Sequence, residues 1–133
     1  MFLGIDLGTS GVKAVLISED GRIAGSGSGK LDVSWPHPGW SEQDPADWIK
    51  ATEAALDELK ARDAAKLSAV RGIGLSGQMH GAVLLDETDK VLRPAILWND
   101  TRSSKEAAAL DADPRFRLIT GNIVFPGFTA PKL

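Results

Sequence analysis

The sequence contains no cysteine, which excludes a disulfide framework, thiolate metal sites and a cysteine nucleophile. Long hydrophobic runs are also missing. The longest, such as those at residues 14–17 and 95–98, fall far short of the roughly 20 residues that a membrane-spanning helix needs. Met1 is followed at once by an apolar segment, with no basic stretch before it and no small-residue cleavage site after it. We therefore expect a cytoplasmic protein without a secretory signal.

An excess of positive charge is likewise missing. The 15 Lys and Arg residues stand against 18 Asp and Glu residues, for a net charge of −3. Without a positive field to attract phosphate backbones or anionic lipid, we expect neither a nucleic acid nor a membrane as partner. The 133 residues are 43% hydrophobic and 25% charged, a composition typical of one globular domain that buries about two thirds of its unfolded surface.

The first thirty residues are expected to form three short strands. Residues 2–7 are apolar and lead into Asp-Leu-Gly-Thr-Ser-Gly at 6–11, whose glycines and hydroxyls suit a tight turn. The segments 12–18 and 22–30 follow, separated by Glu-Asp-Gly at 19–21. This pattern predicts an antiparallel meander.

A helix is expected to follow a proline-rich loop at 35–45. Asp44 suits the N-cap position and Pro45 the first helical position, and the helical pattern runs to about Arg62. One face of this helix should pack on a sheet. That face consists of Trp48, Thr52, Ala55, Leu56 and Leu59.

The second half of the sequence is expected to continue with strands and one more helix. The expected elements are a buried strand at 69–76, a hairpin of 82–85 and 91–98 around a turn at 86–90, and a helix at 103–112 that Asp113 and Pro114 end.

The last residues favour the start of a further helix. Thr129 suits a cap and Pro131 the first turn, but the sequence stops two residues after Pro131, before one full turn could form. We therefore expect residues 1–133 to be the N-terminal part of a longer protein.

The tract Gly-Ser-Gly-Ser-Gly-Lys at 25–30 invites interpretation as a nucleotide loop, because glycine lets phosphates approach the backbone closely. A dinucleotide loop must open a helix, whereas residues 31–38 have no helical pattern. The tract is therefore interpreted as a strand of small residues.

The turn at 6–11 is the stronger candidate for a phosphate site. Its backbone N–H groups and the hydroxyls of Thr9 and Ser10 could bind phosphate oxygens, because phosphoryl transfer depends on positioning and charge neutralisation. Asp6 could hold Mg²⁺ through water, and Lys13 could add positive charge. The alternative is an ordinary hairpin in which Asp6 caps its own turn.

The loop Gly77-Gln-Met-His-Gly81 follows the expected strand at 69–76, where open α/β sheets place ligand-contacting loops. His80 offers a donor or acceptor for a polyol hydroxyl, and Met79 offers an apolar wall. The alternative is that His80 is an ordinary surface residue. His37, the other histidine, lies in the proline loop, and no spacing suggests a metal-ligand set.

Trp98, Asn99 and Asp100 follow another expected strand. An indole suits the C–H face of a sugar, and the two polar side chains could bind its hydroxyls. The alternatives are a core role for Trp98 and a helix-cap role for Asp100. The remaining tryptophans, interpreted as packing residues, are Trp35, Trp40 and Trp48.

The order strand, Asp-Leu-Gly-Thr-Ser-Gly, strand, turn, strand resembles the first phosphate motif of the actin-like ATPase superfamily, which includes sugar kinases, actin and the 70-kDa heat-shock chaperones. Over essentially the whole chain, the sequence is similar to the N-terminal part of the FGGY carbohydrate kinases. Glycerol kinases of this family carry an Arg-Glu pair where Met79 and His80 stand, whereas Gly-Gln-Met-His-Gly with Trp-Asn-Asp is typical of members that act on xylulose. The resemblance is carried by the segments 6–13, 40–45, 76–81, 92–100 with Arg102, 120–121 and 126–133.

The resemblance implies an α/β fold of the ribonuclease H-like, actin-like ATPase type. Its mixed sheet would hold the three-strand antiparallel meander followed by β/α units, and residues 1–133 would form an incomplete N-terminal lobe. The implied reaction transfers the γ-phosphoryl group of Mg-ATP to D-xylulose and gives xylulose 5-phosphate. The catalytic base would be an aspartate in a segment that this sequence lacks. We also expect the full-length protein to be a homodimer.

The same resemblance implies binding roles for particular residues. Met79 and His80 would line the sugar site, and Asp6 would help to place the metal. Trp98, Asn99 and Asp100 are added as sugar contacts from their position after a strand. The residues expected to bind the nucleotide are Asp6, Gly8, Thr9, Ser10 and Lys13.

Three other functions stay open. One is a kinase of the same family for another sugar or polyol, such as ribulose. The second is a non-catalytic actin-like nucleotide-binding module, in which Met79 and His80 have no sugar role. The third is a nuclease of the ribonuclease H-like fold, which needs carboxylates on neighbouring strands for two metals; Asp6 alone is well placed for that.

Overall fold

Alternation of apolar and polar side chains sets the first strands of the sheet. In the computed structural model, which describes residues 1–133, β1 (Phe2–Leu7) pairs antiparallel with β2 (Gly11–Ile17), and β2 pairs antiparallel with β3 (Ile23–Lys30). The antiparallel meander is therefore confirmed. The glycine and serine tract lies within β3, as its interpretation as a strand requires.

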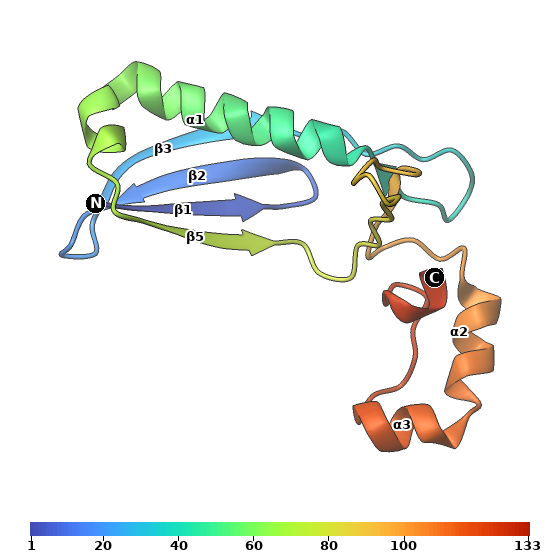
Figure 1. Ribbon diagram of the computed structural model, residues 1–133. Coiled ribbons are helices and arrows are strands. Elements are labelled where there is room, and N and C mark those ends of the chain that lie inside the picture. Colours follow the sequence, from blue (N-terminus) through green and yellow to red (C-terminus); the bar gives the residue numbers. More distant parts are fainter. The chain divides into compact units, whose positions relative to one another are not determined.

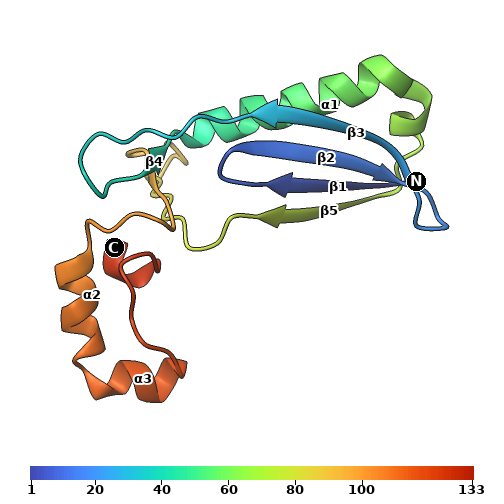
Figure 2. The same cartoon turned by 180° about the vertical axis from the view of Figure 1, so that it is seen from behind.

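The chain divides into two compact units. The first comprises Met1–Asp32 and Ala46–Gln78, and the second Val33–Pro45 and Met79–Leu133. In the first unit, β5 (Gly72–Gly77) joins the meander parallel to β1, which gives a mixed sheet of order β3-β2-β1-β5 (Figures 1 and 2). This sheet matches the expected α/β class.

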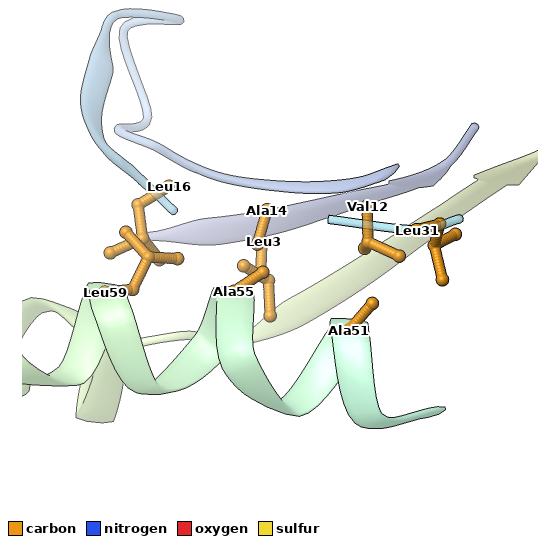
Figure 3. Packing of buried hydrophobic residues seen from close by; sticks show 8 residues of the cluster. All are labelled: Leu3, Val12, Ala14, Leu16, Leu31, Ala51, Ala55 and Leu59. Atoms are coloured by element: carbon orange, nitrogen blue, oxygen red, sulfur yellow. The ribbon is translucent and has the colours of Figure 1, made fainter. Parts of the chain in front are cut away.

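Helix α1 (Pro45–Ser68) runs along one face of this sheet (Figure 1). Figure 3 shows Ala51, Ala55 and Leu59 pointing toward the buried side chains of the strands. Trp48 and Leu56 pack partly buried against the same core, so the expected helical face is confirmed except at Thr52, whose hydroxyl donates to Trp48 O, and Ala51 is an addition to it. The sheet contributes Leu3, Val12, Ala14, Leu16 and Leu31 to the core.

Two glycines of β3 explain how the helix approaches so closely. A Cβ atom at Gly27 would lie 2.1 Å from the carbonyl oxygen of Ala55, and one at Gly29 would lie 2.0 Å from that of Ala51. Any side chain at either position would push the helix off the sheet. The small residues of β3 therefore serve helix packing.

The helix continues past the expected end at Arg62. Asp63 has non-helical backbone angles (φ −159°, ψ 82°), and its carboxylate accepts a hydrogen bond from the backbone N of Lys66 at 3.0 Å. This contact caps a second helical segment after the kink. The helical pattern of the sequence therefore predicted an end next to the kink, but not the continuation of the helix to Ser68.

The expectation that the strand at 69–76 is buried is wrong. β5 begins at Gly72, and Ile73 and Leu75 are 64% and 80% exposed. The strand lies at the edge of the sheet, and the buried residues of α1 pack with β1 and β2 and against β3. Its apolar sequence therefore indicated a strand without revealing what covers it.

The second unit is built on short pairings. β4 (Glu42–Gln43) pairs antiparallel with β6 (Ala95–Ile96), and Ile96 also forms a bridge with Ala82. The turn at 86–90 closes with a hydrogen bond from Asp86 N to Lys90 O at 2.9 Å. The expected hairpin is thus present, although its arms form isolated bridges instead of long strands.

Three helical segments follow. α2 (Ser104–Asp111) occupies the expected place, and a short 3₁₀ segment, η1 (Ala130–Lys132), lies beside it (Figure 1). α3 (Pro114–Thr120) was not expected. The Asp113 carboxylate accepts from the backbone N of Arg115 at 2.9 Å and caps α3, so the dipeptide that ends one helix also starts the next.

The tryptophans differ from one another in their surroundings. Trp48 packs partly buried, and the guanidinium of Arg102 lies 3.7 Å from the centre of the Trp40 ring. Trp35 is 61% exposed, so its interpretation as a packing residue is wrong in this structure. None of the helices has the length and apolar character that a membrane span requires.

Candidate functional site

The β1–β2 turn of the first unit is closed by its own backbone. Gly8 N donates to Gly11 O at 3.0 Å, and Leu31 N donates to Ser10 O at 3.1 Å. A Cβ atom at Gly11 would lie 2.7 Å from Gly29 O, which excludes a side chain there. The turn is therefore fixed by residues on both of its sides, while Ser10 stays exposed.

Thr9 is anchored to the end of β5. Its hydroxyl donates to Oε1 of Gln78 at 3.0 Å, and Gln78 N donates to Leu7 O at 2.8 Å. Gln78 was not among the predicted site residues. Its position after a strand, in a loop flanked by glycines, is the feature of the sequence that could have indicated a role in the site.

Strand register places Asp6 between two polar residues. Asp6 is opposite Lys13 on β2 and opposite Ser76 on β5, and residues opposite one another point to the same face of a sheet. This is the face away from α1, where Asp6 and Lys13 are both exposed. The three polar side chains edge a hollow that is otherwise lined by Gly4, Ile5, Val15, Ile17, Ile23, Gly74 and Leu75.

The arrangement of the acidic side chains decides how the expected magnesium ion could be held. The structure contains no group of three or more His, Cys, Asp or Glu side chains that could hold a metal. Mg²⁺ commonly binds proteins through one or two carboxylates and completes its shell with water and substrate phosphates. A single exposed carboxylate at the end of β1 fits that mode, and Asp6 is the residue that offers it.

In the second unit, the loop after β5 places His80 beside an aromatic group. His80 has φ of +61°, a left-handed conformation that is uncommon for residues other than glycine. Its ring lies 4.7 Å from that of Phe128, and Phe125 packs edge-on against Phe128 at 5.6 Å. Met79 is 58% exposed.

A pocket in the same unit brings together several of the expected sugar contacts. His80, Trp98 and Asn99 all line it, and Trp98 is 45% exposed. Met79 is not among its lining residues. Phe125 and Phe128, which were not predicted, form two further walls of the pocket. The signal for them in the sequence is an aromatic pair that flanks Pro-Gly.

Asn99 carries an unsatisfied acceptor in this pocket. Its side-chain oxygen is buried and has no hydrogen-bond partner in the protein. An unpaired buried acceptor costs about 1–3 kcal/mol.

Asp100 also lines this pocket, but its carboxylate is held by the protein itself. Its residue is 1% exposed, and its carboxylate accepts from Ser41 N at 2.6 Å and from the Arg102 guanidinium at 2.6–3.0 Å. The carboxylate oxygens are therefore engaged within the protein, and Asp100 does not cap α2, whose N-cap is Ser103.

The charges around Arg102 compensate one another. Burial by itself raises the pKa of the Asp100 carboxyl, but hydrogen bonds from Arg102 and from the Ser41 and Arg102 amides outweigh it, so the pKa lies below its ordinary value. Arg102 also contacts Glu42 at 2.6 Å. This buried network joins β4 to the segment that carries Trp98 and Asn99.

Comparison with known proteins places the chain among sugar kinases. The model of the FGGY family of carbohydrate kinases, N-terminal domain, matches residues 1–133. The chain is 57% identical over 134 aligned residues to a xylulose kinase of Klebsiella pneumoniae and 54% identical to one of Escherichia coli (strain K12), covering all of this chain and 27% of each relative.

A solved structure agrees with these relatives. The crystal structure of a xyloylose kinase from Brucella ovis superposes with a TM-score of 0.97 at 69% sequence identity, over 98% of this chain and 28% of that one. The chain thus spans about a quarter of the length of the relatives that it matches.

Proposed function

Since the chain belongs to the FGGY family of carbohydrate kinases, we propose that the protein of which it is the N-terminal part uses ATP to phosphorylate D-xylulose. The hydroxyl oxygen at C5 of the sugar attacks the γ-phosphorus, and the bond from that phosphorus to the β–γ bridging oxygen breaks. The hydroxyl proton passes to a base outside residues 1–133. The products are xylulose 5-phosphate and ADP.

The observation that carries this proposal is the match to xylulose kinases over the whole chain. Because 100% of the chain is covered at 57% identity, both the β1–β2 turn and the His80 pocket lie within the matched region. The pocket supports a sugar in its own right: Trp98 and Phe128 offer faces to C–H groups, and His80 and Asn99 offer polar atoms.

The first unit would bind the nucleotide. Gly8 would shape the turn, the amides of Thr9 and Ser10 and the Ser10 hydroxyl would contact phosphate oxygens, and Lys13 would offset their negative charge. Asp6 would hold Mg²⁺, directly or through water, and the ion would neutralise charge on the transferring phosphoryl group.

The second unit would bind the sugar through Met79, His80, Trp98 and Asn99. Asp100 would line the same site while holding Arg102. Positioning of the acceptor hydroxyl against the phosphorus is the main source of rate in such a reaction, and it can supply about 7–11 kcal/mol. Residues 1–133 alone, lacking the base, would show no xylulose-dependent ATP hydrolysis or transfer.

The test is a substrate panel on the full-length protein. ADP release is measured with D-xylulose, D-ribulose, L-ribulose, gluconate and glycerol at saturating Mg-ATP. The proposal predicts the highest kcat/KM with D-xylulose. A clear preference for another sugar would assign a different kinase of the family, and ATP binding without any sugar-dependent turnover would favour a nucleotide-binding module. Light scattering on the same sample tests the proposed homodimer.

A further inference from the structure

One lysine joins the three segments that surround the sugar pocket. Lys132 lies in η1, and its Nζ donates to His80 O at 2.7 Å, to Leu97 O at 2.8 Å and to Gly127 O at 2.6 Å. An ammonium group has three donors and no acceptor. All three donors of Lys132 are therefore committed to main-chain carbonyls.

Each of these carbonyls belongs to, or directly precedes, a residue of the pocket wall. His80 is itself part of the wall, Leu97 precedes Trp98, and Gly127 precedes Phe128. The three segments lie far apart in the sequence, at 79–81, 95–98 and 125–128. The ammonium group is thus the point at which the pocket walls are joined.

The geometry at two of these carbonyls needs an external support. His80 has φ of +61°, and residues held in such sparsely populated conformations cost about 1–3 kcal/mol. Gly127 lies so close to the strand end that a Cβ atom there would be 2.2 Å from Trp98 O. Charge-assisted hydrogen bonds from Lys132 hold both in place.

The surroundings keep Lys132 poorly solvated. Burial lowers the pKa of its ammonium group to about 8; the charge of Asp100 opposes this shift, and that of Arg102 adds to it. At neutral pH the group is mainly charged, and it offers all three donors. Above pH 8 it loses one.

We propose that Lys132 is a positioning residue of the sugar site, which fixes the distance and angle between His80, Trp98 and Phe128 without touching the sugar. This inference rests on the proposed function for the identity of the ligand. It assigns a binding role to a residue with no contact to the reacting atoms, and it explains why the pocket walls keep one arrangement.

The test compares kinetic constants of the full-length protein and three variants. In Lys132→Met, which keeps much of the side-chain volume and removes the donors, KM for D-xylulose should rise about tenfold or more, with KM for ATP within about twofold of wild type. Lys132→Arg keeps the charge but does not offer three donors from one atom. Its KM for D-xylulose should lie between those of wild type and Lys132→Met. Lys105→Met, on the exposed side of α2, should match wild type.

A pH profile separates positioning from a purely structural role. KM for xylulose of the wild type should rise above about pH 8 as Lys132 deprotonates, while Asp100 and Arg102 keep their charges. In Lys132→Met this rise should be absent. Since KM does not depend on the fraction of enzyme that is folded, a lowered Tm alone does not mimic the result.

Two outcomes would overturn the inference: an unchanged KM for xylulose in Lys132→Met, or an equal rise in KM for both substrates. Failure of the proposed function looks different, because the wild type itself would then not turn over xylulose. If the panel shows a preference for another sugar, the same comparison with that sugar decides the role of Lys132.

Discussion

The hydroxyl of Thr9 donates a hydrogen bond to Oε1 of Gln78 at 3.0 Å, across 69 residues of sequence. Gln78 N in turn donates to Leu7 O at 2.8 Å. The parallel pairing of β1 and β5 makes this possible, because it brings the carboxyl ends of both strands to one edge of the sheet. The phosphate candidate Thr9 is thus held by the residue that directly precedes Met79 and His80.

Removing this hydrogen bond should weaken nucleotide binding. Thr9→Val keeps the side-chain shape, removes the hydroxyl and leaves the Gln78 amide without this partner. A hydrogen bond of this kind is worth about 1 kcal/mol, so KM for ATP should rise about fivefold. Thr9→Ser, which keeps the hydroxyl, is the matched control. Equal KM values for ATP in the two variants would contradict the role of the bond.

Asp6 and His80 should affect different substrates. In Asp6→Asn, kcat should fall by about tenfold or more and the Mg²⁺ concentration for half-maximal rate should rise, because the metal loses a charged ligand. Its KM for xylulose should stay near that of wild type. Asp57→Asn, at an exposed position of α1, is the control. A change in sugar KM alone would place Asp6 outside the metal site.

His80→Ala should instead raise KM for xylulose more than KM for ATP. The variant removes both a polar contact and the ring that packs on Phe128 at 4.7 Å, and a loss of about tenfold in sugar affinity is expected. His37→Ala changes the other histidine, in the proline loop, and should leave both constants unchanged. An equal rise in KM for ATP and in KM for xylulose would contradict the assignment of His80 to the sugar site.

A glycine of β3 should be sensitive to a single methyl group. A Cβ atom at Gly29 would lie 2.0 Å from Ala51 O, whereas one at Gly74 of β5 would meet nothing within 4 Å. Gly29→Ala should therefore lower the free energy of unfolding by about 1–3 kcal/mol or more, and Gly74→Ala should leave it nearly unchanged. Urea unfolding followed by tryptophan fluorescence measures both. Similar urea midpoints in Gly29→Ala and Gly74→Ala would argue against the close packing of α1 on β3.

Stability should fall in acid partly through Asp100. Its folded pKa is depressed, so its contribution is fully present above the unfolded pKa of about 3.9 and is lost as the pH falls through the folded value. The free energy of unfolding of Asp100→Asn should be lower at pH 7 and should decline less than that of wild type below pH 4. Glu106→Gln, exposed on α2, should follow the wild-type curve.

Local patterns predicted those elements whose causes are local. The meander follows from strand periodicity and turn residues, and α1 begins where Asp44 and Pro45 indicate. The dipeptide Asp113-Pro114 was interpreted only as a stop, because the same residues suit the start of a helix and α3 has little apolar periodicity. The exposure of β5 depends on which elements cover the sheet, and strand sequence does not encode that.

Only those parts of the candidate site that are continuous in the sequence could be predicted. The β1–β2 turn and the loop at 77–81 are continuous motifs, and they were found. The hydrogen bond from Ser41 to the Asp100 carboxylate could not be predicted, because Ser41 lies 59 residues away in the sequence. Lys132 was missed because its three acceptors come from separate segments, and nothing near it in the sequence marks their convergence.

The most direct measurement is a crystal structure of the full-length protein with D-xylulose and a non-hydrolysable ATP analogue. The account predicts the sugar against His80, Trp98 and Asn99, and the triphosphate against the β1–β2 turn at Gly8, Thr9 and Ser10. A sugar bound elsewhere, with the His80 pocket empty, or phosphates bound away from the β1–β2 turn would contradict it.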